Sequence, residues 1–124
     1  MRRVLGLCLM LMASTSYATE LQMRSEGECN YAADMVLTAL AGRQSNVSES
    51  TLRNMMQRMY FATDPKKWQP VLDAVLSYTR NSKVVAQDAN SHAQVVNMMC
   101  VLTQGDLSQA LGIKPDTSKP AVKS

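Results

Sequence analysis

The spacing of the apolar residues is the feature that most limits what this chain can fold into. Nearly every apolar run repeats at the helical period, and no stretch alternates with the two-residue period of a strand. The clearest run has apolar side chains at i, i+3, i+4, i+7 and i+8: Leu52, Met55, Met56, Met59 and Tyr60. The sequence therefore predicts an all-α fold, a compact bundle of four to five short helices.

Glycine, proline and cap residues divide the chain between these helices. We expect a first helix over 29–43 stopped by Gly42, a last short helix over 106–112, and three helices between them. The third helix is expected to begin at Pro70, after a helical turn or loop over 64–69. The fourth begins near Val84 or is capped at Ser91, and its predicted inner face consists of His92, Val95, Val96, Met99, Leu102 and Thr103.

Residues 1–18 have the layout of a secretory signal peptide. Two arginines precede an apolar run over 4–13, and small residues at 16 and 18 precede the predicted cleavage after Ala18. The run is too short to span a bilayer as a permanent helix, and no second apolar stretch is long enough. We therefore predict a periplasmic protein without stable membrane insertion, with a helical domain over 19–112 and a flexible tail over 113–124 that contains two prolines and three lysines.

Cleavage at this point leaves two cysteines, Cys29 and Cys100, which are 71 positions apart. An even pair in an exported chain predicts one disulfide. Two buried free thiols are the alternative. Such a bond would tie the first helix to the last long one. Because it would close a long loop, we expect it to contribute a large share of the domain's stability.

The net charge argues against several partners. Cleavage removes two of the 13 basic residues and none of the 10 acidic ones, which leaves a net charge of +1. A nearly neutral surface does not attract DNA, RNA or anionic lipid over a distance. We therefore expect no nucleic-acid partner.

Catalytic and metal-binding patterns are not found. His92 is the single histidine, and there is no nucleophile elbow, paired-carboxylate site or phosphate-binding glycine loop. Seven of the ten methionines follow the signal, so soft sulfur ligands for Cu(I) are an alternative, although their spacing matches core packing better. We expect no enzyme activity, no cofactor and no metal, and a structural role for His92.

The segment around the single tryptophan is the predicted partner-binding site. Trp68 follows Lys66 and Lys67 between two prolines that restrict the backbone, so binding would cost little ordering entropy. A tryptophan beside lysines has the composition of an interface anchor, in which the charges guide encounter and the ring fills a pocket. The alternative is that Trp68 folds inward as part of the core.

Two segments carry a family resemblance. Asn30-Tyr31-Ala32-Ala33-Asp34-Met35-Val36-Leu37 resembles the first helix of the periplasmic immunity proteins that neutralise type VI secretion amidases. Asn97-Met98-Met99-Cys100-Val101-Leu102, followed by a polar turn and a short last helix, is similar to the end of that family. Together they cover roughly a quarter of the predicted mature chain. Cys29 departs from the pattern, because the family's cysteine is expected further along the helix.

The resemblance implies a helical inhibitor that occludes the active site of a toxic enzyme. Its partner would be a secreted cell-wall hydrolase, and the inhibitor itself can form a homodimer. The alternative is a small disulfide-bonded chaperone of acid stress, which shares size, export and helicity. A structural accessory of an envelope assembly is a third class.

Overall fold

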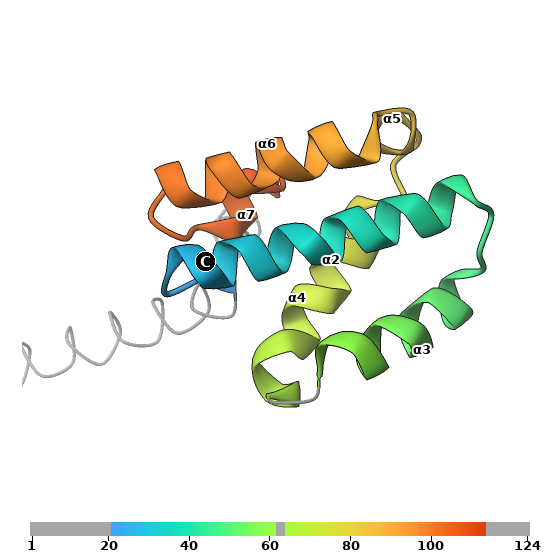
Figure 1. The fold of residues 1–124 in the computed structure, drawn as a ribbon, viewed down its shortest axis with the longest axis horizontal. Coiled ribbons are helices and arrows are strands. Elements are labelled where there is room, and N and C mark those ends of the chain that lie inside the picture. Colours follow the sequence, from blue (N-terminus) through green and yellow to red (C-terminus); the bar gives the residue numbers. More distant parts are fainter. Residues whose placement is uncertain (1–20, 62–63, 114–124) are drawn as a thin grey trace, which may run out of the picture.

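The structure is a computed structural model that describes residues 21–61 and 64–113. Within them the chain forms six helices: α2 (Glu26–Gln44), α3 (Glu49–Tyr60), α4 (Pro65–Tyr78), α5 (Ser82–Val85), α6 (Ala89–Leu102) and α7 (Leu107–Ala110). These described residues contain no strand, only an isolated antiparallel bridge between Gln22 and Asp106. The predicted all-α bundle with one long-range disulfide is confirmed (Figure 1).

The ends of the chain are only partly covered by the structure. The predicted signal peptide over 1–18 and residues 114–124 of the predicted tail lie outside the described residues. Ile113 belongs to the folded domain, because it packs against the core and its N–H donates to the Ser108 carbonyl at 2.8 Å. The tail was therefore predicted one residue too early. Over the described residues, no helix is both long and apolar enough to cross a membrane.

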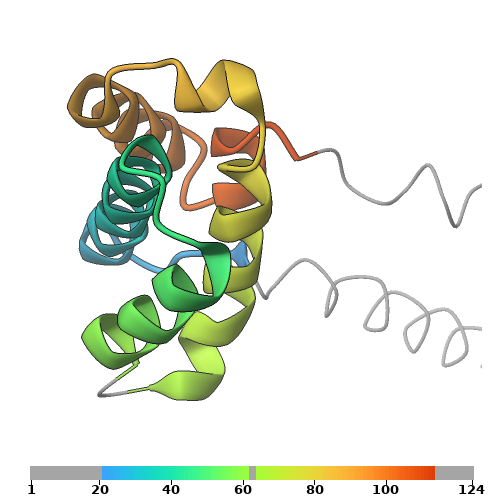
Figure 2. The same cartoon turned by 90° about the vertical axis from the view of Figure 1, so that its right-hand side faces the viewer.

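Helix α2 is the centre of the bundle. It lies between α6 and α3, and α4 packs across both α2 and α3 (Figure 2). Its buried residues point in several directions, as expected for a helix with neighbours on several sides. Many of them are small, which lets the neighbouring helices approach closely: Ala32, Ala33, Ala39 and Gly42.

The limits of α2 differ from the prediction. It begins three residues earlier, because the Ser25 side chain caps it by accepting from the Glu28 N–H at 3.1 Å. It also runs through Gly42, which the sequence had suggested as its stop. Gly42 lies under α3, where a Cβ would come within 2.7 Å of the Leu52 side chain, so this glycine serves helix packing rather than termination.

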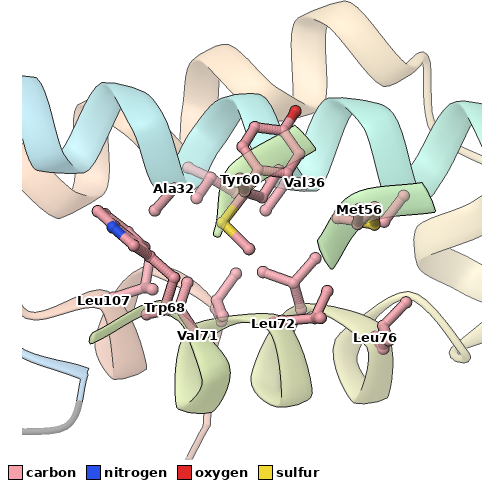
Figure 3. Close-up of a cluster of buried hydrophobic side chains, with 14 of the residues drawn as sticks. Ala32, Val36, Met56, Tyr60, Trp68, Val71, Leu72, Leu76 and Leu107 are labelled. Carbon is pink, nitrogen blue, oxygen red and sulfur yellow. The ribbon is translucent and has the colours of Figure 1, made fainter. Parts of the chain in front are cut away.

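Helix α4 begins at Pro65, so the predicted start at Pro70 was wrong, and of the two alternatives for 64–69 the loop is excluded. The Asp64 side chain caps the helix by accepting from the Lys67 N–H at 3.1 Å, and Pro70 lies inside it. Pro70 is the sixth residue of the helix, past its first turn, and it removes one backbone hydrogen bond at a cost of about 3 kcal/mol. Burial of one continuous apolar stripe outweighs that loss: Trp68, Val71, Leu72, Val75 and Leu76 (Figure 3).

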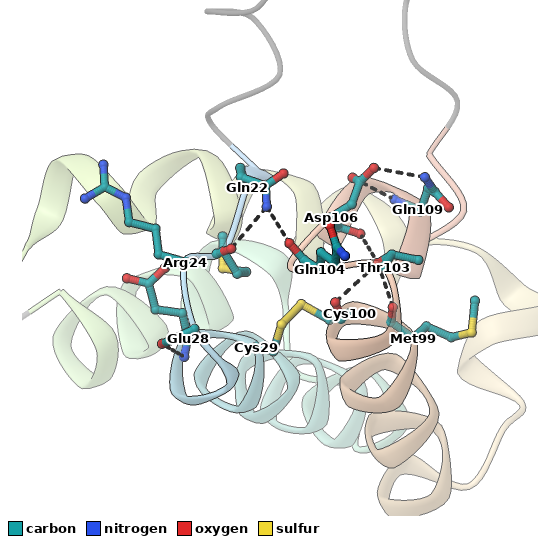
Figure 4. Close-up of a disulfide and its surroundings, with 12 residues drawn as sticks. Gln22, Arg24, Glu28, Cys29, Met99, Cys100, Thr103, Gln104, Asp106 and Gln109 are labelled. Atoms are coloured by element: carbon teal, nitrogen blue, oxygen red, sulfur yellow. Dashed lines mark hydrogen bonds between the residues drawn. A yellow bond between two sulfur atoms is a disulfide. The ribbon is translucent and has the colours of Figure 1, made fainter.

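Helix α6 is rotated relative to the predicted inner face. Asp88, not Ser91, caps it, and its buried residues are Ala93, Val96 and Cys100. The disulfide sets this rotation, because Cys100 must face α2 to reach Cys29, with a Cα–Cα distance of 5.7 Å (Figure 4). The predicted face was half wrong: Val96 is buried, whereas Val95, Met99 and Leu102 are exposed.

The extended segment before α2 is fixed to the end of α6. The Met23 N–H donates to the Gly105 carbonyl at 2.7 Å, and Met23 is buried. Gly105 has φ +90°, and a Cβ there would lie 1.9 Å from the Met23 carbonyl oxygen. Glycine is required at this crossing for both reasons.

Three charged side chains join the end of α2, the start of α3 and the end of α4. The Glu49 carboxylate accepts from Arg43 Nη2 at 2.7 Å and from Arg80 Nε and Nη2 at 2.9 and 2.7 Å. Arg43 also donates to the Leu76 carbonyl at 2.9 Å. The hydrogen bonds from Arg80 and Arg43 lower the pKa of Glu49 from 4.5 to about 2.

The disulfide is expected to contribute strongly to stability. Loss of the bond by the Cys29→Ser substitution should lower the free energy of unfolding by about 4 kcal/mol, because the unfolded chain gains the entropy of a long open loop. Urea unfolding of the oxidised, reduced and substituted proteins measures this. Two free thiols in the denatured, unreduced wild-type protein would contradict the assignment.

The Glu49 cluster predicts a pH dependence of stability. A carboxylate with a lowered pKa contributes its full stabilisation above about pH 4.5 and loses it progressively toward about pH 2. Glu49→Gln should therefore destabilise the protein near neutral pH, and the difference from wild type should shrink over this range. Urea unfolding at several pH values tests this, with Asp73→Asn, in the more exposed pair with Arg53, as the control. A difference that does not change with pH would contradict the assignment.

Candidate functional site

A groove lies where the starts of α2 and α4 come together. Its volume is about 830 Å³. The residues used below line it from two sides: Arg24, Glu28 and Tyr31 from the α2 side, and Lys66, Lys67 and Trp68 from the first turn of α4. All three residues of the predicted partner-binding site therefore border one groove.

Trp68 is the floor of this groove and part of the core. Its side chain is 6% exposed and lies among the buried side chains of the core (Figure 3). Its ring lies 4.4 Å from that of Tyr31, centroid to centroid. The prediction that Trp68 lies on a loop and fills a pocket of a partner was wrong, because Trp68 occupies a helical position at the start of the buried α4 stripe. The alternative, an inward-folded tryptophan, describes its position.

Tyr31 and Tyr60 extend this aromatic floor. Their rings meet edge to face at 5.2 Å, and the Tyr31 hydroxyl donates to the Tyr60 carbonyl at 2.8 Å. The Tyr60 hydroxyl in turn lies 2.6 Å from the Asp34 carboxylate, and burial followed by this hydrogen bond raises the pKa of Tyr60 well above its usual 10. Three aromatic rings thus lock α2, α3 and α4 together beneath the groove.

Lys67 is held within the groove wall. Its ammonium lies 3.1 Å from Glu28 Oε1, donates to the Gln22 carbonyl at 3.3 Å, and sits 5.7 Å from the Trp68 ring centroid. Burial raises the pKa of Glu28, but the Arg24 N–H bond and Lys67 outweigh it, and the pKa lies below 4.5. This lysine therefore positions the two helix starts relative to each other.

Lys66 and Arg24 are the exposed cations of the groove. Both are exposed, and within residues 21–61 and 64–113 neither forms an ion pair with an acidic side chain. The two predicted lysines therefore differ: Lys66 is available to a partner, whereas Lys67 is engaged inside the protein. Whether either contacts a partner stays a prediction.

Sequence reasoning missed the α2 side of the groove. Arg24 and Glu28 precede the predicted start of the first helix at 29, and nothing local places them beside Lys66. One signal was present: Ser25-Glu26-Gly27-Glu28 has the S-x-x-E form of a helix start. Ser25 is the residue that caps α2 in the structure. The long-range pairing with α4 depends on the fold and has no such signal.

The other candidate catalytic and metal-binding residues, His92 and the methionines, do not come together in one site. His92 is partly buried, and its Nε2 is hydrogen-bonded to the Tyr78 hydroxyl, whose ring stacks on it. Burial lowers the pKa of His92. The part of the chain that the structure describes contains no group of three His, Cys, Asp or Glu side chains that could hold a metal. Met56 is fully buried in the core, whereas Met98 and Met99 lie exposed on a different helix.

No protein-family model, curated protein or solved structure matches this chain.

Trp68 is buried and Lys66 is exposed, so alanine substitution of the two residues should affect stability differently. Trp68→Ala should lower the free energy of unfolding by about 3–5 kcal/mol, because it removes a ring packed among buried side chains. Lys66→Ala, two residues away and exposed, should change it by less than about 0.5 kcal/mol. Urea unfolding of both variants decides this. Equal stability of Trp68→Ala and wild type would mean that the ring is not part of the core.

Proposed function

We propose that this protein is a periplasmic binding protein that inhibits a toxic cell-wall-targeting enzyme by occluding its active site. The observation that carries this proposal is the groove, whose walls are fixed and whose rim carries two exposed cations without an ion pair in the described part of the chain, next to one exposed carboxylate, the α4 cap Asp64. Lys66 and Arg24 border it from two helix starts, and neither is neutralised within the described residues. The family resemblance of the segments over 30–37 and 97–102 supports the same class.

Rigidity supports inhibition by occlusion. The disulfide joins the start of α2 to α6, and the buried Trp68 holds the first turn of α4 against Tyr31. The Lys67–Glu28 ion pair connects the two helix starts directly. A surface that is already ordered loses little conformational entropy on binding, which favours a tight complex.

The charges support a partner with an acidic rim. Two exposed cations on an otherwise nearly neutral protein guide association with a surface of opposite charge and fix its orientation. In this proposal Lys66 and Arg24 meet carboxylates at the rim of the enzyme's cleft, and the α4 helix start enters it. The inhibitor itself performs no chemistry.

An acid-stress chaperone is the alternative, and the exposed apolar residues of α6 favour it. Such a protein must loosen in mild acid and expose client-binding surface. The Glu49 cluster argues against that behaviour, because a carboxylate with a pKa of about 2 stays ionised through mildly acidic pH. Hydrophobic-dye binding and suppression of aggregation of unrelated proteins at mildly acidic pH would favour the chaperone.

The test uses a secreted peptidoglycan hydrolase, to be sought among the genes that neighbour this chain's own, with release of peptide from purified peptidoglycan as the readout. The exported protein should abolish release at one equivalent. Lys66→Glu, and separately Arg24→Glu, should each raise the inhibitor concentration needed for half inhibition about tenfold or more, because each replaces an attractive charge by a repulsive one.

Lys83→Glu is the matched control. This substitution makes the same charge change on α5, which is at a different end of the bundle from the groove (Figure 1). It should inhibit like wild type. Undiminished hydrolase activity in excess inhibitor, or equal inhibition by Lys66→Glu and Lys83→Glu, would contradict the proposal.

A further inference from the structure

A second cavity lies along the seam between α2 and α6, with a volume of about 330 Å³. Its polar side chains come from both helices: Asn30 and Asp34 from α2, and Asn90, Gln94 and Asn97 from α6. We call this cavity the α2–α6 cleft, and the three asparagines with Gln94 the cleft amides. The two helices pack side by side in opposite directions (Figure 1). Residues 30 and 97 therefore lie at the end of the cleft that is near the disulfide.

The cleft amides are not used inside the protein. Within residues 21–61 and 64–113 none of their side chains forms a hydrogen bond, whereas the Gln44 amide on the same α2 helix donates to the Val85 and Gln87 carbonyls. Asn97 is partly buried, and its Oδ1 is buried without a partner in the described residues. A buried acceptor without a donor is unfavourable. Because the amide torsion of asparagine is broad, this side chain can turn to a ligand that offers an N–H.

The lining of the cleft argues against several classes of ligand. Among the described residues that line it, Asp34 is the only charged one, so an anionic ligand would meet repulsion and no cation. Tyr31 is the only aromatic residue among them. Its ring packs against the rings of Trp68 and Tyr60, which leaves no open aromatic face for a sugar ring to pack against. An uncharged or basic ligand with many hydrogen-bonding groups fits this lining.

The spacing of the polar side chains matches an extended peptide backbone. A carboxamide offers a donor and an acceptor side by side. In an extended chain the N–H and C=O of one residue point the same way, and this arrangement recurs at every second residue, about 6.6 Å further on. Asn90 and Gln94 are about 6 Å apart along α6, and so are Asn30 and Asp34 along α2, because each pair is four helical residues apart. Each wall of the cleft can therefore bond one edge of the same peptide.

We propose that the α2–α6 cleft binds a short peptide in extended conformation, of uncharged or basic composition. The cleft amides pair with its main chain, and Asp34 lies beside a basic side chain. The distance from Asn90 to Asn97 is about 10 Å along α6, which corresponds to about three extended residues. Because main-chain hydrogen bonds supply the affinity, the cleft selects conformation more than sequence.

This inference does not depend on the proposed inhibitor function. The groove is lined from α2 and α4, whereas the cleft is lined from α2 and α6. A contact of about three residues is small, so we expect a dissociation constant on the order of 0.1–1 mM. Loss of inhibition and loss of peptide binding would therefore be separate results, obtained with different variants.

The probe is the end-blocked peptide acetyl-Thr-Val-Lys-Val-Thr-amide, whose residues favour an extended chain. Its titration into isotope-labelled protein is followed by the side-chain NH₂ signals in NMR spectra. The signals of the cleft amides should shift in a saturable manner, and that of Asn54, an exposed amide on α3, should not. Gln94→Ala should raise the dissociation constant at least about fivefold, because it removes a donor and an acceptor. Asn54→Ala is the matched control and should bind like wild type; both residues are exposed, so both variants should fold.

Two altered peptides test the mode of recognition. The same peptide with N-methylated valines lacks two main-chain donors and should bind at least about fivefold more weakly. A glutamate in place of the lysine should weaken binding at low salt, and Asp34→Asn should reduce that difference. Absence of cleft-amide shifts at millimolar peptide, or equal binding of the N-methylated peptide, would overturn the proposal. So would unchanged affinity of Gln94→Ala, or cleft-amide shifts with a trimer of N-acetylglucosamine but not with the peptide.

Discussion

The covalent bond between Cys29 and Cys100 is the constraint on which the rest of this structure depends. It joins the start of the central helix α2 to the end of α6, and α3, α4 and α5 lie in the loop between them. Closing so long a loop removes much of the unfolded chain's freedom, which matters in a small domain. The bond also fixes which face of α6 is buried, and so which residues remain on the surface. The exposure of Val95, Met99 and Leu102 follows from this one link.

The groove between α2 and α4 illustrates how core and surface are coupled. The same first turn of α4 contributes Trp68 to the core and Lys66 to the surface, only two residues apart. Lys67 lies between them and pairs with Glu28 across the groove. A cation at the rim is therefore supported by a ring packed beneath it. Such support gives a binding surface its fixed geometry.

The fold class was predictable because helical periodicity and cap residues act locally. The cysteine pair and most of the α3 stripe were correctly interpreted from sequence, and only Met59 of that stripe is exposed. The errors concern effects that only tertiary packing decides. Pro70 suggested a break, but burial of Trp68 with Val71 and Leu72 carries the helix through it. Gly42 suggested an end, but α3 requires its small size there. The face of α6 was misassigned because larger apolar residues were favoured over the small Ala93 that lets α6 approach α2.

The candidate site was predictable only in part, for the same reason. Lys66, Lys67 and Trp68 do border one groove, because they are neighbours in sequence. Their different roles depend on Glu28 and Tyr31, which are brought to them by the packing of α2 against α4. Arg24 reaches the groove because Met23 is fixed to Gly105, a contact between distant parts of the chain. Local patterns carry no information about such a contact.

A titration of isotope-labelled protein with the unlabelled cell-wall enzyme proposed as its partner, followed by amide NMR spectra, is the most direct test. In this proposal the groove at the starts of α2 and α4 is the surface that binds the enzyme. Amides of Arg24, Glu28, Lys66 and Lys67 should then shift or broaden up to one equivalent, while those of α5 stay unchanged. Changes restricted to the outer face of α6, with the groove amides unaffected, would contradict the account.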